Sequence, residues 1–124
     1  MISKEDIEKI RAFADSKSHL VAVYVFGSVV TERDRRGSDL DIAIISKRVI
    51  EGFELVEMET ALSNLLRRDV DLVVFGQVSP LLQHQILKDG RLVYGFESME
   101  RVTQEVSARR QYLDTRSLYK ELDS

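Results

Sequence analysis

The sequence predicts an α/β protein of the α+β type, with a mixed β-sheet and helices packed mainly on one side of it. Three observations support this. Short apolar, β-branched runs alternate along the chain with longer segments of helical spacing. The 124 residues suit one domain, and 44% apolar residues suffice for a buried core. The single proline and the lack of a Pro- or Gly-rich linker leave no internal boundary.

The first predicted element is a helix over residues 4–15. Its apolar side chains recur at the spacing of one helical face and are Ile7, Ile10 and Ala14. Ser3 and Asp6 resemble a capping box, in which the serine side chain satisfies a backbone N–H of the first turn. The helix therefore has a defined start and one buried face.

Apolar runs predict the strands. Residues 20–26 form a continuous β-branched run, which is typical of a strand buried on both faces. Residues 40–45 and 70–75 are apolar runs that each contain one aspartate. Residues 91–96 predict a short fourth strand.

Three further helices are expected. The second covers residues 54–68, and its predicted apolar stripe consists of Leu55, Met58, Leu62, Leu65 and Leu66. The third begins with Ser79 as N-cap and Pro80 at the first helical position, and it ends at Gly90 as the C′ residue. The fourth follows Glu97, with helical spacing of Met99, Val102, Val106 and, after an interruption at Arg109 and Arg110, Leu113. Residues 97–124 are thus expected to extend the domain formed by residues 1–96. Arg109 and Arg110 are left open between a solvated helix face and a partner contact.

Composition excludes several classes of protein. Without cysteine there is no disulfide scaffold, thiolate metal site or cysteine nucleophile. No apolar run approaches the length of a membrane span, and the first ten residues lack the apolar stretch of a signal peptide, so a cytoplasmic protein with no membrane contact is expected. The 18 basic and 21 acidic residues give a net charge of -3, which argues against direct nucleic-acid binding.

Three aspartates are the candidate catalytic and metal-binding residues. Asp39 and Asp41 lie two residues apart, so their side chains project from the same face of a strand. Asp71 lies inside an apolar run, where an acid needs a partner or a metal. If their strands are neighbours, three carboxylates hold Mg²⁺, with room for the two ions of a phosphoryl-transfer site. Asp69 competes as the third acid but lies at the strand entry, which favours a surface role.

A small polar segment follows the first strand. Gly27 allows close approach of backbone to a ligand, and Ser28 offers a hydroxyl and an N–H for a phosphate. Ser38 shapes the turn before Asp39. Gly27, Ser28 and Ser38 are therefore the candidate nucleotide-binding residues.

The combination of Gly27-Ser28, a ten-residue spacer, Asp39-x-Asp41 and a later Asp71 resembles the DNA polymerase β-type nucleotidyltransferase superfamily. Over residues 20–96 the chain is most similar to the minimal nucleotidyltransferases, the MntA-type antitoxins of HEPN/MNT toxin–antitoxin systems. The resemblance implies a nucleotidyltransferase domain over residues 1–96, with ATP as substrate. It also implies transfer of AMP to a tyrosine of a cognate HEPN ribonuclease toxin, in a hetero-oligomer with that toxin.

One departure from that family pattern falls just after the Gly-Ser pair. Family members commonly have an Ala-Arg-Gly segment where this chain has Val30-Thr31-Glu32. An arginine that would meet the triphosphate is therefore replaced by Thr31. Compensation from the same loop would come from Arg33, Arg35 or Arg36.

Two other functions remain compatible with the sequence. The first is a nucleotidyltransferase that modifies the hydroxyl of a small molecule, although a chain this short has little room for a second pocket. The second is an antitoxin that masks its toxin by contact alone, without catalysis. Acid-to-amide variants distinguish this last function, since masking does not need the three carboxylates.

Overall fold

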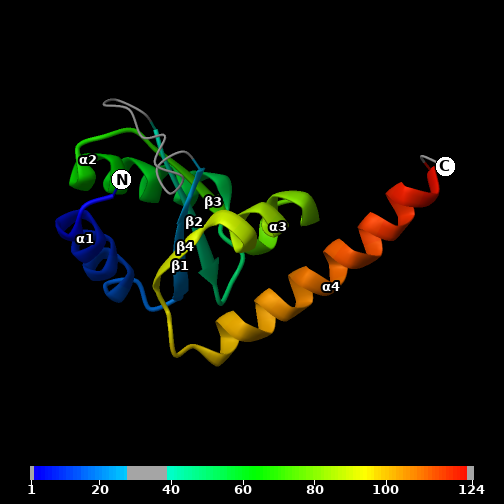
Figure 1. Ribbon diagram of the computed structural model, residues 1–124. Helices are drawn as coiled ribbons and strands as arrows, with labels where there is room; N and C mark the ends of the chain where they lie inside the picture. Colours follow the sequence, from blue (N-terminus) through cyan, green and yellow to red (C-terminus); the bar gives the residue numbers. More distant parts are fainter. Residues whose placement is uncertain (1, 28–38, 123–124) are drawn as a thin grey trace.

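The structure, a computed structural model, describes residues 2–27 and 39–122. In this part of the chain, four strands form one sheet of order β3-β2-β1-β4, flanked by four α-helices (Figure 1). The elements in chain order are α1 (Lys4–Asp15), β1 (Leu20–Phe26), β2 (Leu40–Ser46), α2 (Gly52–Leu66), β3 (Val70–Val74), the 3₁₀ turn η2 (Phe75–Gln77), α3 (Pro80–Asp89), β4 (Arg91–Tyr94) and α4 (Met99–Leu122).

The sheet is mixed, as predicted. β1 lies in its interior and pairs antiparallel with both β2 and β4, whereas β2 pairs parallel with β3. Every residue of β1 from Leu20 to Val25 is buried, which confirms that its apolar run is covered on both faces. The parallel pair requires a crossover connection, and α2 supplies it.

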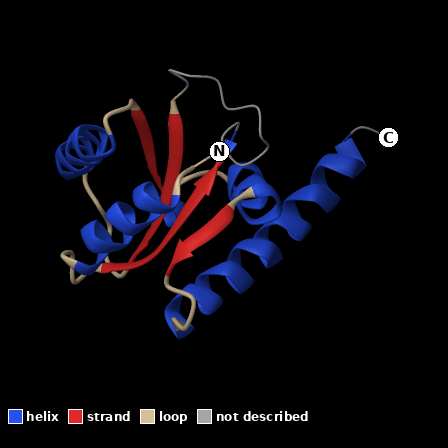
Figure 2. Ribbon diagram, turned by 60° about the vertical axis from the view of Figure 1, so that its left-hand side comes forward, coloured by secondary structure: helices blue, strands red, loops and turns tan. Residues whose placement is uncertain are grey.

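The helices do not pack mainly on one side, so this part of the prediction was wrong. α1 and α2 cover one face of the sheet, whereas α3 and α4 cover the other, and Figure 2 shows blue helices on both sides of the red strands. The physical reason is that β1 and β2 are apolar on both faces. Ile42 packs in the cluster under α1 and α2, whereas Ala43 packs under α3 and α4. Each face therefore needs its own cover.

Helix α1 agrees with the prediction, including the cap, where the Ser3 hydroxyl accepts a hydrogen bond from the Asp6 backbone N–H at 3.0 Å. Helix α2 begins and ends two residues earlier than predicted, at Gly52 and Leu66. Arg67 follows it in the left-handed region, with φ of 55°. Leu65, which was predicted on the apolar stripe, is 38% exposed. The buried residues of α2 are Met58, Leu62 and Leu66, so the face that packs on the sheet is narrower than the predicted stripe.

Helix α3 has the predicted N-terminus, where the Ser79 hydroxyl accepts from the Leu82 N–H at 3.3 Å. Gly90 does end the helix, but its φ of -78° is not the left-handed conformation of a C′ glycine. Glycine fits there for a steric reason, since a Cβ would overlap the carbonyl oxygen of Ile86 and lie 3.4 Å from the Phe26 Cβ. The end of α3 is therefore packed tightly against the end of β1.

Helix α4 turns inward a face other than the one that carries its regularly spaced apolar residues. Met99 and Leu113 are 76% and 58% exposed, whereas Glu105 and Ala108 are buried. The apolar residues that keep helical spacing therefore face away from the sheet.

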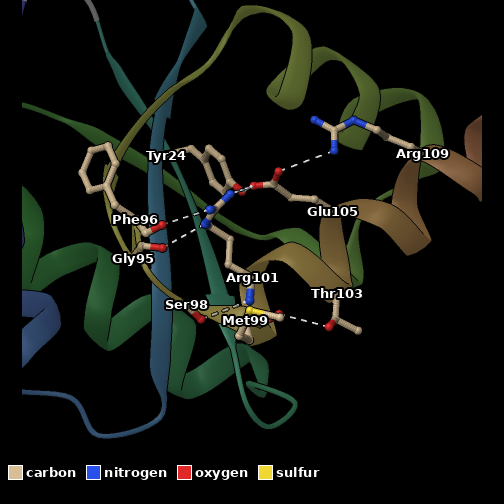
Figure 3. Close-up of polar contacts among 9 residues, drawn as sticks. All are labelled: Tyr24, Gly95, Phe96, Ser98, Met99, Arg101, Thr103, Glu105 and Arg109. Atoms are coloured by element: carbon tan, nitrogen blue, oxygen red, sulfur yellow. Dashed lines mark hydrogen bonds and ion pairs between the residues drawn. The ribbon is translucent and has the colours of Figure 1, made fainter.

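The buried Glu105 is held by donors from two directions (Figure 3). The Tyr24 hydroxyl donates to its Oε2, and Arg101 pairs with the same oxygen at 2.5 Å. Arg101 also donates to the carbonyl oxygens of Gly95 and Phe96, at 2.8 and 3.2 Å. This cluster fastens the start of α4 to β1 and to the turn after β4, and it makes burial of a carboxylate tolerable.

Within residues 2–27 and 39–122, no helix has both the length and the apolar character needed to cross a membrane.

Candidate active site at the start of β2 and β3

The predicted acids meet at one edge of the sheet, where β1 ends and β2 and β3 begin. The parallel pairing sets Asp41 directly beside Asp71, and Leu40 beside Val70. A backbone hydrogen bond from the Leu40 N–H to the Asp69 carbonyl oxygen, 2.9 Å long, closes the ladder at this edge. Residues in register on neighbouring strands present their side chains to the same face. The prediction that β3 lies beside the strand of Asp39 and Asp41 is therefore confirmed.

Asp41 is the electrostatically perturbed member of the group. Its carboxyl is half-buried, and burial is the main cause that raises its pKa. The negative charges of Asp71 and then Asp39 raise the pKa further. Asp39 and Asp71 themselves are exposed. Three acids thus lie near enough to oppose one another's ionisation, which is the condition that a bound cation relieves.

Gly27 lies against this carboxylate. Its φ of 81° is in the left-handed region, and Phe26 immediately before it pairs with Asp41 across the antiparallel ladder. A Cβ at residue 27 would overlap the Asp41 Oδ2 and lie 3.1 Å from its Cγ. The absence of a side chain therefore leaves the space that the Asp41 carboxylate occupies.

The arrangement fits Mg²⁺ only in part. Asp41 and Asp71 are adjacent, and Mg²⁺ is commonly held by one or two carboxylates together with substrate phosphates and water. However, residues 2–27 and 39–122 contain no group of three or more histidines or acids arranged so that they could hold a metal ion. The structure thus brings the acids to one edge without assembling them into a closed three-ligand set.

The family follows from the sequence match. Residues 8–98 match the family described as polymerase beta, nucleotidyltransferase. The chain belongs to this nucleotidyltransferase family. The protein adenylyltransferase MntA of Shewanella oneidensis is 30% identical over 86 residues, which are 69% of this chain and 62% of that protein. The match therefore spans less than two thirds of the length of this relative.

Solved structures show that the nucleotidyltransferase shares its whole fold with known proteins. A toxin–antitoxin crystal structure with AMP-PNP superposes with a TM-score of 0.83 at 25% identity, over 94% of both chains. A Shewanella oneidensis complex of a tri-AMPylated HEPN toxin with an MNT antitoxin gives a TM-score of 0.80 at 22% identity, over 98% of this chain and 95% of that one. The predicted α+β class with a mixed sheet and the predicted family are thus confirmed.

Several predicted site residues of this nucleotidyltransferase lie outside the described residues. They are the nucleotide-binding candidates Ser28 and Ser38, together with Thr31 and the loop arginines Arg33, Arg35 and Arg36. Asp69, the competing acid, is exposed just before β3. Its backbone carbonyl oxygen accepts the hydrogen bond from the Leu40 N–H. Asp39, Asp41, Asp71 and Gly27 are therefore the predicted site residues that the structure places.

Two residues of α2 that sequence reasoning missed hold β3 from outside. β3 is an edge strand of the described sheet, so some of its backbone N–H groups lack a strand partner. The Ser63 hydroxyl accepts from the Val70 N–H at 3.0 Å, and the Glu59 carboxylate accepts from the Leu72 N–H at 2.9 Å. These two bonds flank Asp71 and fix the strand that carries it. Their signal in the sequence is the four-residue spacing of Glu59 and Ser63 beside the apolar stripe of the helix.

Proposed function

We propose that this nucleotidyltransferase transfers AMP from ATP to a tyrosine hydroxyl of a cognate HEPN ribonuclease toxin and thereby acts as its antitoxin. The observation that carries the proposal is the in-register pair Asp41 and Asp71, with Gly27 against the Asp41 carboxylate. The similarity to a protein adenylyltransferase and to toxin–antitoxin structures supports the choice of AMP and of a protein acceptor.

The three carboxylates would hold Mg²⁺. Asp41 and Asp71 lie side by side, and Asp39 adds negative charge next to them. Bound Mg²⁺ supplies positive charge to the triphosphate and to the leaving pyrophosphate. Gly27, Ser28 and Ser38 are the residues proposed to meet the triphosphate, and Gly27 lies against the Asp41 carboxylate.

The transfer step needs little covalent chemistry from the protein. The acceptor oxygen forms a bond to the α-phosphorus of ATP, while the bond from that phosphorus to the pyrophosphate oxygen breaks. The hydroxyl proton passes to the exposed carboxylate of Asp71, which acts as general base. Pyrophosphate leaves with the electron pair of the broken bond. Catalysis then consists mainly of positioning and stabilisation of charge.

A folded protein is the proposed acceptor because the chain itself offers little surface for one. The four strands and four α-helices that the structure describes account for nearly all of residues 2–27 and 39–122. A partner protein brings its own surface to the open edge of the sheet, which implies a hetero-oligomer of nucleotidyltransferase and toxin.

The experiment is an intact-mass measurement on a cognate HEPN protein after incubation with this chain, ATP and Mg²⁺. We expect the mass of the HEPN protein to increase in steps of one AMP, with the modified residue a tyrosine by fragmentation. Asp39→Asn/Asp71→Asn should abolish the increase while the far-UV circular dichroism stays unchanged. Asp114→Asn, an exposed aspartate on α4, is the matched control and should transfer AMP normally.

The same experiment separates the alternatives. Near wild-type transfer by Asp39→Asn/Asp71→Asn contradicts the proposed mechanism. Neutralisation of the toxin by that variant, with no AMP added, indicates masking by contact. Pyrophosphate release only with a small hydroxyl compound, and none with the HEPN protein, indicates a small-molecule acceptor.

A further inference from the structure

A pocket lies between α3 and α4, outside the end of the sheet at which Asp39, Asp41 and Asp71 lie (the carboxylate edge). The two helices pack side by side on one face of the sheet (Figure 1). The pocket has a volume of about 290 Å³, and its lining includes His84, Lys88, Arg109, Tyr112, Leu113 and Arg116. This volume approaches the lower end of the range of small-ligand pockets.

The charged side chains that line this pocket are all positive. Its three charged residues, Lys88, Arg109 and Arg116, are all cations. Arg109 lies 3.6 Å from a Glu105 oxygen, but that carboxylate is already engaged by Arg101. Lys88 and Arg116 have no ion-pair partner in the part of the chain that the structure describes. A cationic lining in a chain of net charge -3 favours an anionic ligand and disfavours a metal ion.

The same pocket contains a flat ring surface. The His84 and Tyr112 rings stack with centroids 3.8 Å apart and an interplanar angle of 5°. Leu113 adds an apolar side chain to the lining. Stacked rings beside cations are the combination that binds a base together with its phosphate, because the base stacks and the phosphate accepts charge-assisted hydrogen bonds.

We propose that the α3–α4 pocket binds a nucleotide unit, with its phosphate on Lys88, Arg109 and Arg116 and its base on the Tyr112 ring. The unit is a nucleoside monophosphate, either free or at the end of an RNA, since both present the same groups. Inorganic phosphate would leave the rings unused, and an acidic peptide would leave no base to stack. The proposal does not rest on the proposed function, because none of these residues belongs to the carboxylate edge.

The Lys88 end of the pocket lies towards the carboxylate edge of the sheet. Lys88 is two residues before Gly90, and Gly90 packs beside Phe26 at the end of β1. β1 leads directly into Gly27. A nucleotide bound between α3 and α4 would therefore lie on the α3–α4 face of the sheet, near the end at which the aspartates gather.

The test is an NMR titration of the full chain with AMP in EDTA, which removes metal and prevents any transfer. We expect saturable shifts of the His84 and Tyr112 ring resonances. Lys88→Gln/Arg116→Gln should weaken binding at least tenfold. Lys4→Gln/Lys47→Gln removes the same charge from exposed positions elsewhere and should bind AMP like the wild type. Circular dichroism checks that both variants are folded.

Further ligands decide the remaining points. Binding of a short 5′-phosphorylated oligoribonucleotide but not of AMP, with the same ring shifts, supports the site with RNA as its source. Inorganic phosphate or a polyglutamate peptide that binds as tightly as AMP overturns the nucleotide assignment. Absence of ring shifts with both AMP and the oligoribonucleotide overturns the site itself. Since no transfer is measured, these results are independent of the HEPN experiment.

Discussion

Replacement of Gly27 by alanine tests the geometry of the candidate active site most directly. The substitution adds a single methyl group at a residue with φ of 81°. The new Cβ would overlap the Asp41 carboxylate oxygen Oδ2. Either the backbone of residue 27 or the side chain of Asp41 must move, and both changes act on the site.

The magnitude follows from these two terms. An alanine in the left-handed region costs about 1–2 kcal/mol, and a side chain forced off its rotamer costs about 0.5–1.5 kcal/mol. We therefore expect Gly27→Ala to lower the free energy of unfolding by about 1.5–3.5 kcal/mol. For a chain of this length, the melting temperature should fall by roughly 5–15 °C. A carboxylate displaced by about 1 Å should lower AMP transfer on the order of 100-fold.

Thermal unfolding by far-UV circular dichroism and AMP transfer by intact mass measure the two effects. Gly52→Ala is the matched control, because a Cβ there meets nothing within 4 Å and the residue begins α2. It should leave transfer unchanged and should not lower the melting temperature, since alanine favours the helix by up to about 1 kcal/mol. A Gly27→Ala protein with both wild-type melting temperature and wild-type transfer would refute the close approach of residue 27 to Asp41.

Three further predictions concern residues around the sheet. Tyr24→Phe should lower the free energy of unfolding by about 1.5–3 kcal/mol in urea titrations, because the Glu105 carboxylate loses a buried donor. Burial and the hydrogen bond to Glu105 raise the pKa of Tyr24. The contribution of the hydroxyl to stability is therefore fully present below the ordinary tyrosine pKa and is lost as the pH rises above about 10. The difference in the free energy of unfolding between wild type and Tyr24→Phe should shrink in that range. Asp71→Asn should abolish AMP transfer. In EDTA at pH 7 the same substitution should raise the free energy of unfolding, because it removes one of the negative charges that raise the pKa of Asp41. The increase should be less than about 1 kcal/mol, because solvent screens the exposed carboxylate of Asp71. Because its pKa is raised, ionised Asp41 destabilises the folded protein at pH values above that pKa. The stabilisation by Asp71→Asn should therefore disappear at acid pH, where Asp41 is protonated. Glu59→Ala should lower the transfer rate, measured by the same mass assay, because an N–H at the outer edge of β3 loses its acceptor beside Asp71.

Each of these predictions has an outcome that contradicts it. If the difference in the free energy of unfolding between wild type and Tyr24→Phe did not change with pH, ionisation of the Tyr24 hydroxyl would have no effect on stability. A less stable Asp71→Asn protein would mean that repulsion at the edge is negligible. Wild-type transfer by Glu59→Ala would show that strand β3 needs no support from α2, and an alanine at Glu57, an exposed glutamate of the same helix, is its control.

The strands, and the end of the sheet at which the aspartates meet, could be predicted from the sequence because their signals are local. β1 and β2 are runs of apolar residues, and an aspartate within such a run stands out. The neighbour relation of the two acid-bearing strands also followed, since a strand–helix–strand unit places its strands in parallel. The side-by-side position of Asp41 and Asp71 is a direct result of that topology.

The orientation of α4 could not be predicted, because it depends on partners far away in the chain. Met99 and Leu113 keep helical spacing but are exposed, whereas Glu105 is buried. Tyr24 and Arg101 satisfy its carboxylate, and Tyr24 belongs to a strand 81 residues earlier. A periodicity within one segment contains no information on such a partner. The same limit explains why helices were expected mainly on one face of the sheet.

The pairing of β2 with β3 also determines which changes in chain length the candidate active site tolerates. The ladder, not the number of residues between them, holds Asp41 beside Asp71. Residues gained or lost in the connection before α2 alter the path of the chain but leave the two acids opposite each other, whereas a change within α2 would displace Glu59 and Ser63 from β3. A single residue inserted into β3 before Asp71 would instead turn that carboxylate to the other face of the sheet. The site is thus robust to changes of length in the connection before α2 and fragile to the same changes inside either strand.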